Sequence, residues 1–136
     1  MTEHEQQVRL VNWAACNEDR YPELALLYAV PNAGRRTKRQ GAWMVAEGLK
    51  AGVPDLVLPV ARHGYHGLYI ELKTERGRLT PEQKAWLKAL YDQGYLAVMC
   101  RGWEDARDLI LCYLESTPIG DLGLDRPEDR QSERRG

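Results

Sequence analysis

Apolar residues recur at intervals of three and four positions along four stretches of the chain. This spacing places apolar side chains on one face of a helix. Gly52 with Pro54 ends the second of these stretches, and Gly94 ends the third. The stretches that we expect to be helical are 3–16, 42–49, 81–93 and 103–114.

Four shorter runs predict β-strands, because they are apolar or alternate between apolar and polar residues. The second and third runs are separated only by a polar loop at 61–66, and so short a link predicts an antiparallel hairpin. The order of elements predicts an α/β fold, with a small mixed β-sheet flanked by helices. The expected strands are 24–30, 55–60, 67–73 and 95–100.

The same spacing predicts which helical side chains are buried. Trp13, Trp43 and Trp86 fall on these apolar faces, so we expect them to pack in the core rather than to stack on bases. In the first helix the expected stripe is Val8, Val11 and Ala15, widened by Leu10, Trp13 and Ala14. The other expected core residues are Ala42, Trp43, Val45, Ala46, Leu49, Ala85, Trp86, Ala89, Leu90, Ala106, Leu109, Ile110 and Tyr113.

The length of 136 residues fits one domain. Residues 1–115 are expected to form it, because the composition from Ser116 onward turns to Pro, Gly, Asp, Glu and Arg, as in a flexible tail. No run approaches the roughly 18 apolar residues of a membrane span, and the N-terminus lacks the basic-then-apolar order of a signal peptide. We therefore expect the protein in the cytoplasm.

The three cysteines, Cys16, Cys100 and Cys112, are scattered and form no CxxC pair. This argues against a zinc site and a disulfide framework. Each cysteine is set among apolar neighbours, which predicts buried free thiols.

The net charge of -1 gives no overall attraction to nucleic acid, so the distribution of charge matters more. Basic groups concentrate in two places, and a phosphate backbone held beside an acidic site needs such groups. The alternative for any one of them is a solvated surface position. The two groups are Arg35, Arg36, Lys38 and Arg39, and then Lys73, Arg76, Arg78, Lys84 and Lys88.

The most specific chemical signal is Asp55, followed on the next expected strand by Glu71 and Lys73. Side chains alternate along a strand, so Glu71 and Lys73 project to one side while Ile70 and Leu72 point into the core. The hairpin would bring Asp55 close to Glu71. A solvated Glu-Lys pair and a Pro-Asp turn are the alternative interpretations.

These residue types suit the hydrolysis of a phosphodiester. A hard cation such as Mg²⁺ binds carboxylate oxygens, neutralises phosphate charge and activates water. Asp55 and Glu71 are the expected ligands, with the backbone carbonyl of Leu72 as a further donor and Glu3 completing the site. The Lys73 ammonium can position or deprotonate a water and offset the charge of the transition state. Glu5, by contrast, is expected on the surface as a partner of Arg9.

Two further polar motifs have structural explanations. Thr80 and Pro81 predict a helix start, and Gln83 occupies the capping-box position of that helix. His63 and His66 fall in the hairpin loop, where we expect exposure to solvent, with contact to DNA as the alternative.

Taken together, these motifs resemble the VRR-NUC branch of the PD-(D/E)XK nuclease superfamily. The resemblance spans about residues 3–115, with Glu3 and Gln7 matching in the first helix. One departure is Ala33, where many relatives have glycine. The matching segments are 31–34, 52–55, 70–73 and 79–83.

The resemblance implies a restriction-endonuclease-like fold in which Asp55 and Glu71 bind the metal and Lys73 is the catalytic lysine. It also implies that Glu3 assists the metal and that Gln83 lies in the cleft near the site. Similar proteins occur as stand-alone nucleases of phages and prophages, and related domains act on branched DNA such as Holliday junctions or flaps.

We therefore expect a Mg²⁺-dependent DNA endonuclease, with Mn²⁺ as a second usable cation, that is selective for branched DNA. A four-way junction has two-fold symmetry and two strands to cut, which favours a homodimer. The alternatives are a DNA-binding or assembly module that keeps the nuclease fold for phage replication or packaging, and an enzyme acting on another phosphate ester. The residues expected to contact DNA are Asn32, Arg35, Arg36, Lys38, Arg39, Lys50, Arg76 and Arg78.

Overall fold

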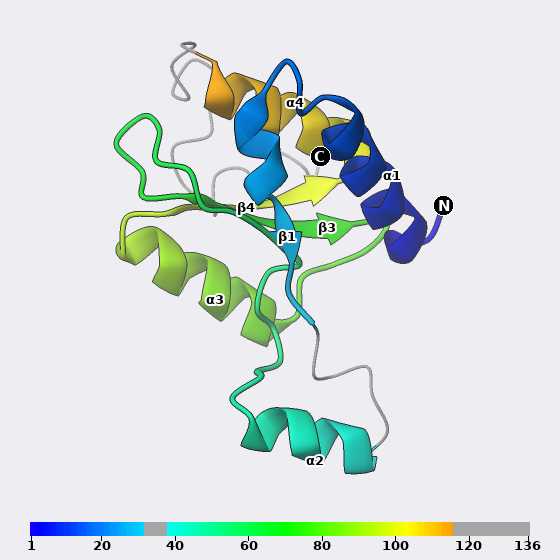
Figure 1. Ribbon diagram of the computed structural model, residues 1–136. Helices are drawn as coiled ribbons and strands as arrows, with labels where there is room; N and C mark the ends of the chain where they lie inside the picture. Colours follow the sequence, from blue (N-terminus) through cyan, green and yellow to red (C-terminus); the bar gives the residue numbers. More distant parts are fainter. Residues whose placement is uncertain (32–37, 116–136) are drawn as a thin grey trace.

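The computed structural model describes residues 1–31 and 38–115, and these form a mixed sheet flanked by helices, as the sequence predicts. Figure 1 shows the arrangement. The helices are α1 (Glu3–Cys16), the 3-10 helix η1 (Pro22–Leu26), α2 (Lys38–Ala46), α3 (Pro81–Asp92) and α4 (Trp103–Leu114). The strands are β1 (Tyr28–Ala29), β2 (Leu56–Leu58), β3 (Leu68–Lys73) and β4 (Leu96–Arg101).

The four strands lie in the order β1-β2-β3-β4. Strands β2 and β3 pair antiparallel with Leu56 opposite Ile70, so the predicted hairpin is confirmed. Strand β4 runs parallel to β3, and α3 is the crossover that a parallel connection requires. The short strand β1 pairs antiparallel with β2 at the edge of the sheet.

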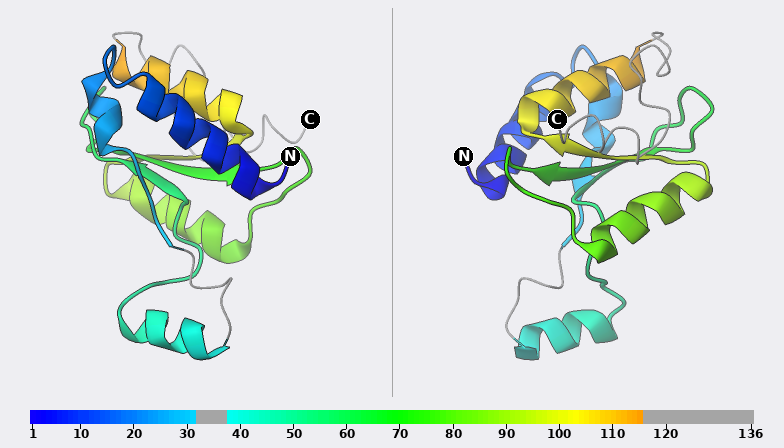
Figure 2. Two further views of the ribbon diagram at one scale, coloured as in Figure 1. Left: turned by 45° about the vertical axis from the view of Figure 1, so that its right-hand side comes forward. Right: turned by 180° about the vertical axis from the view of Figure 1, so that it is seen from behind.

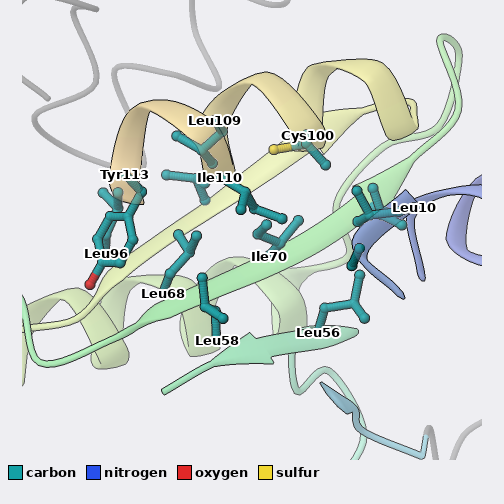
Figure 3. Close-up of a cluster of buried hydrophobic side chains, with 14 of the residues drawn as sticks. Leu10, Leu56, Leu58, Leu68, Ile70, Leu96, Cys100, Leu109, Ile110 and Tyr113 are labelled. Atoms are coloured by element: carbon teal, nitrogen blue, oxygen red, sulfur yellow. The ribbon is translucent and has the colours of Figure 1, made fainter. Parts of the chain in front are cut away.

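The helices cover both faces of this sheet. Helices α1 and α4 lie side by side on one face, and α3 lies on the other (Figures 1 and 2). The main core lies between the sheet and the α1–α4 layer, as Figure 3 shows. A smaller cluster of Leu87, Ala97 and Met99 lies under α3.

Strand β3 divides its side chains between these two faces. Leu68, Ile70 and Leu72 belong to the main core. Since strand side chains alternate, Glu71 and Lys73 point to the face on which α3 lies. The predicted division of β3 into an apolar and a polar side is therefore confirmed, and it places the candidate catalytic groups on the α3 face.

The prediction of one strand over 24–30 is wrong, because residues 24–26 belong to the 3-10 helix η1 and only Tyr28 and Ala29 form a strand. Pro22 opens η1, where its fixed φ angle suits a first turn and its missing N–H is not needed. Leu24 is buried by that turn, and only Tyr28 and Ala29 remain to pair with β2. The apolar run thus serves two short elements instead of one buried strand.

The predicted apolar faces of α1 and α3 are displaced by about one residue. In α1, Leu10 and Ala14 are buried, while Val8 and Val11 of the expected stripe are exposed, as is Ala15. In α3 the buried apolar residue is Leu87, whereas Ala85 and Ala89 are exposed and Trp86 is half-buried. Each helix buries only a narrow stripe of side chains. Which of several neighbouring apolar residues are buried therefore depends on the side of the helix that faces the sheet. The core residues predicted for α4 are confirmed.

Helix α2 departs most from the prediction. It covers Lys38–Ala46 rather than 42–49, and Gly48, with a φ of 102°, follows its end. Trp43 is 66% exposed and Val45 is 61% exposed, so the predicted burial of this face is wrong. Figures 1 and 2 show the reason, because α2 projects away from the sheet and its other helices.

The cysteines also differ from their prediction. Cys100 is buried and Cys112 is half-buried, but Cys16, at the end of α1, is exposed. All three are free thiols. In the described ranges, no helix has the length and apolar character needed to cross a membrane. The tail predicted from residue 116 lies outside the described residues.

Candidate active site

Asp55 is held at the point where the chain enters β2. It directly precedes Leu56, and continuing the β2–β3 register places it opposite Glu71. Its side-chain Oδ2 accepts a hydrogen bond from the Leu72 N–H at 2.8 Å. Its backbone carbonyl accepts another from the Val30 N–H, also at 2.8 Å. Asp55 is therefore fixed from both sides although it lies just outside the strand.

Glu71 is the most deeply buried acid of the described residues, with only 2% of its surface exposed. Burial raises the pKa of its carboxyl to about 10, and a hydrogen bond with Asp55 and the negative charge of Asp55 add to the rise. The nearby Lys73 opposes this increase in pKa, and Glu3 contributes slightly to it. The buried Glu71 carboxyl is therefore held in its protonated form beside the half-buried Asp55.

A divalent cation fits this pair of acids. Burial and the neighbouring Asp55 disfavour ionisation of Glu71, so a divalent cation bound between the two carboxyl groups can replace the proton of Glu71. Oxygen donors are those that Mg²⁺ and Mn²⁺ prefer. The backbone of Leu72 adds a further donor, since the N–H and C=O of a strand residue point to the same edge and its N–H faces Asp55.

Lys73 lies two residues beyond Glu71 on the same side of β3, and 6% of its surface is exposed. Its backbone carbonyl accepts a hydrogen bond from the Gly102 N–H at 3.0 Å, which ties it to the end of β4. A side chain on Gly77 would come within 3.3 Å of the Lys73 side chain, so the loop after β3 lies against it. The side chain is therefore enclosed by the loop after β3, and its charge acts on Glu71.

Arg101 is a residue of this region that the sequence analysis missed. Its Nη1 donates to three carbonyl oxygens of the loop after β3, those of Thr74, Glu75 and Gly77, at 2.8, 2.9 and 2.7 Å. A guanidinium suits such a task because it presents several donors in a fixed plane. The available signal was a basic residue at the end of an otherwise apolar strand. Arg101 holds the loop that follows Lys73.

Gln83 has the structural role predicted for it. Its backbone N–H donates to Thr80 Oγ1 and its side-chain oxygen accepts from the Thr80 N–H, which completes a capping box at the start of α3. Only 9% of its surface is exposed. Its neighbour Glu82 packs against Gly52, so the chain passes the start of α3 three residues before Asp55. A role of Gln83 in the reaction stays a prediction.

The acids of α1 have separate environments. Glu5 is exposed and its carboxylate accepts hydrogen bonds from the Thr2 backbone N–H and hydroxyl, so its main partner is Thr2 rather than the predicted Arg9. Glu3 is half-buried and its charge acts on Glu71. Across residues 1–31 and 38–115, no three His, Cys, Asp or Glu side chains come together as a metal-binding group. Assistance of the metal by Glu3 therefore stays a prediction.

The predicted DNA-contacting residues divide into two groups. Asn32, Arg35 and Arg36 lie outside the described residues. Lys38 begins α2, and the remaining four residues are exposed: one lies in α2, one follows α2, and two lie in the loop after β3. These four are Arg39, Lys50, Arg76 and Arg78. His63 and His66 are exposed in the hairpin loop, as predicted, and His63 Nε2 lies 3.0 Å from the Tyr113 carbonyl.

An α/β domain with paired acids and a lysine at the end of a central hairpin defines a nuclease-type protein. Comparison with known families matches residues 1–104 to the VRR-NUC domain. The chain therefore belongs to the VRR-NUC family, as the sequence motifs predict, and this membership implies a nuclease-type function on DNA.

Two relatives support this assignment. A solved structure described as a VRR_NUC domain protein superposes with a TM-score of 0.67 at 29% sequence identity, covering 84% of this chain and 88% of that one. The Fanconi-associated nuclease 1 homolog of Arabidopsis thaliana is 37% identical over 54 residues. That match covers 38% of this chain and only 6% of the plant protein, so the chain corresponds to a small part of that relative.

Proposed function

We propose that this chain is an endodeoxyribonuclease that requires Mg²⁺ or Mn²⁺ to hydrolyse phosphodiester bonds. Its active-site residues in this proposal are Asp55, Glu71 and Lys73. The observation that carries the proposal is the buried Glu71 carboxyl, which has a raised pKa and lies beside the half-buried Asp55 and the buried Lys73. A structural role alone does not explain this arrangement, since a buried carboxyl group with a raised pKa destabilises the fold at neutral pH.

Each residue has a defined task in this proposal. Asp55 and Glu71 would hold the cation, with the Leu72 carbonyl and Glu3 as further groups. When bound, the cation would supply charge neutralisation for the phosphate and activation of water. The Lys73 ammonium would orient the attacking water and offset charge on the phosphate oxygens. The hydrogen bond from the Leu72 N–H keeps Asp55 directed toward Glu71.

For the substrate, we propose branched DNA, such as a Holliday junction or a flap, cut by a homodimer. The exposed Arg76 and Arg78, in the loop that follows Lys73, and the exposed Arg39 and Lys50, in and after α2, offer positive charges to a phosphate backbone. A two-fold symmetric dimer would present two such sites to the two strands of a four-way junction. Phage origin and a cytoplasmic location stay predictions from the sequence.

Cleavage assays on junction, flap and linear DNA, with Mg²⁺, Mn²⁺ or EDTA, test this proposal. Asp55→Asn and Lys73→Met should each lower the cleavage rate by at least about 100-fold, because such groups commonly contribute 10²–10³. Asp19→Asn, at an exposed position after α1, is the matched control and should cleave like the unchanged protein. Full activity of either active-site variant, or equal activity in EDTA, would contradict the site assignment.

The oligomeric state needs its own measurement. Sedimentation at assay concentrations should show a dimer, and binding of Mg²⁺ should be measurable by calorimetry. A monomer that still makes paired cuts in a junction would remove the dimer from the proposal. DNA binding without any binding of a divalent cation would favour a non-catalytic DNA-binding module instead.

A further inference from the structure

Helix α2 carries large apolar side chains that no neighbouring helix or strand covers in the part of the chain that the structure describes. Trp43 and Val45 are among its most exposed residues, and α2 projects away from the sheet in both views of Figure 2. An exposed tryptophan on a helix that does not pack against the core is unusual for a surface that contacts only water. This exposure indicates a partner for α2.

The charge of the same segment indicates the kind of partner. Residues 38–50 contain Lys38, Arg39 and Lys50 against one acid, Glu47, in a chain whose net charge is -1. Arg39 precedes Trp43 by four residues, so the two lie on the same side of the helix. A basic group beside an aromatic ring is the combination that binds single-stranded nucleic acid, where the cation contacts phosphate and the ring stacks on a base.

The position of α2 connects this surface to the candidate site. The chain leaves the sheet after Val30 and returns at Asp55, and these two residues are hydrogen-bonded to each other. On the return, Gly52 packs against Glu82 at the start of α3. The segment that carries α2 therefore begins and ends next to the candidate site, so DNA bound by the exposed side of α2 would be connected to that site through a short stretch of chain.

We propose that α2 is a DNA-binding arm and that Trp43 stacks on an unpaired base at the branch point of the substrate. This inference rests on the proposed function and deepens it by naming a residue that distinguishes branched from continuous duplex DNA. A second copy of the chain fits less well, because a symmetric contact between two α2 segments would bring together two surfaces of the same positive sign.

The test compares Trp43→Ala with Val8→Ala, a truncation of an exposed apolar side chain on α1, outside the proposed arm. Dissociation constants are measured in EDTA, so that no cleavage occurs, for a forked DNA with 2-aminopurine at the unpaired branch position and for a linear duplex of equal length. Trp43→Ala should bind the fork about tenfold more weakly, the loss expected for one stacked base, and the duplex with nearly unchanged affinity. Val8→Ala should bind both within about twofold of the unchanged protein.

A direct readout accompanies the affinities. The unchanged protein should quench the 2-aminopurine fluorescence, Trp43→Ala should not, and Trp43→Phe should restore most of the quenching because it keeps an aromatic ring. Unaltered fork binding by Trp43→Ala, or an equal loss for fork and duplex, would overturn the proposal. The proposal would also be overturned if Trp43→Ala converted a dimer to a monomer and left the fork affinity per protomer unchanged, since Trp43 would then belong to the dimer interface.

The outcomes separate this inference from the proposed function. Absence of Mg²⁺- or Mn²⁺-dependent cleavage by the unchanged protein would count against the nuclease proposal. Normal cleavage together with unaltered fork binding by Trp43→Ala would leave the nuclease intact and reject only the arm.

Discussion

Replacing Glu71 with glutamine should stabilise the protein in the absence of divalent cations. The Glu71 carboxyl is buried, and its pKa is raised to about 10 mainly by that burial, with Asp55 adding to the effect. Glutamine has nearly the same shape, and its N–H₂ can donate to Asp55 as the protonated acid does, but it never ionises. The variant removes the titration and keeps the packing.

The expected magnitude follows from the two pKa values. In the unfolded chain the pKa of this acid is about 4.5, against about 10 in the folded protein, so folding takes up a proton at any pH between them. A raised pKa in an acid means that stability is greatest below the unfolded value and falls as pH rises, by about 1.4 kcal/mol per pH unit. At pH 7.5 Glu71→Gln should therefore be more stable than the parent by roughly 4 kcal/mol, and near pH 4.5 by almost nothing.

Urea unfolding in EDTA at one-unit steps from pH 5 to pH 8 measures this difference. Glu18→Gln, an exposed acid of the same kind, is the matched control and should run parallel to the parent. Adding Mg²⁺ should reduce the pH dependence of the parent, because a bound cation stabilises the ionised carboxylate, and should change Glu71→Gln less. A stability difference between parent and Glu71→Gln that is the same at pH 5 and pH 8 would refute the reasoning.

Three further substitutions test the fold around the site. Tyr113→Phe removes the hydroxyl that donates to a buried backbone carbonyl at 2.7 Å, and should lower the free energy of unfolding by about 1–3 kcal/mol in urea titrations. Gly52 has a φ of 87°, and a Cβ at this position would lie 2.8 Å from Glu82, whereas Gly48 has a φ of 102° and open space around it. Gly52→Ala should therefore lower the melting temperature more than Gly48→Ala does. Equal decreases would contradict the packing argument. Arg101→Met removes the Nη1 group that donates to three carbonyl oxygens, so it should speed hydrogen exchange in the loop after β3, and unchanged exchange would show that the loop is held otherwise.

The local sequence was sufficient to predict the central part of the site. The strand alternation that separates Glu71 from Leu72, and the short link that makes a hairpin, act between residues near one another in the chain. The capping box at Thr80 is likewise local, and the structure contains it. These features were predictable because they depend on spacing alone.

Tertiary direction was not predictable in this way. The spacing in α1 and α2 is amphipathic, but it does not say which side meets the sheet, or whether the helix meets it at all. The exposure of Val8 and Trp43 follows from where α1 and α2 are placed relative to the strands. Arg101 was missed for the same reason, since its acceptors lie 24 to 27 residues away in the chain.

The hydrogen bond between the Val30 N–H and the Asp55 carbonyl joins the two residues that flank the segment 31–54. Because the flanking residues are hydrogen-bonded to each other, the length and sequence of this segment can change with little loss of stability in the strands that carry the acids. If α2 binds DNA as proposed, such a nuclease can keep one chemical centre while its DNA-binding segment changes. Transplanting the 31–54 segment between relatives should accordingly transfer preference for a DNA shape without transferring, or harming, the cleavage step.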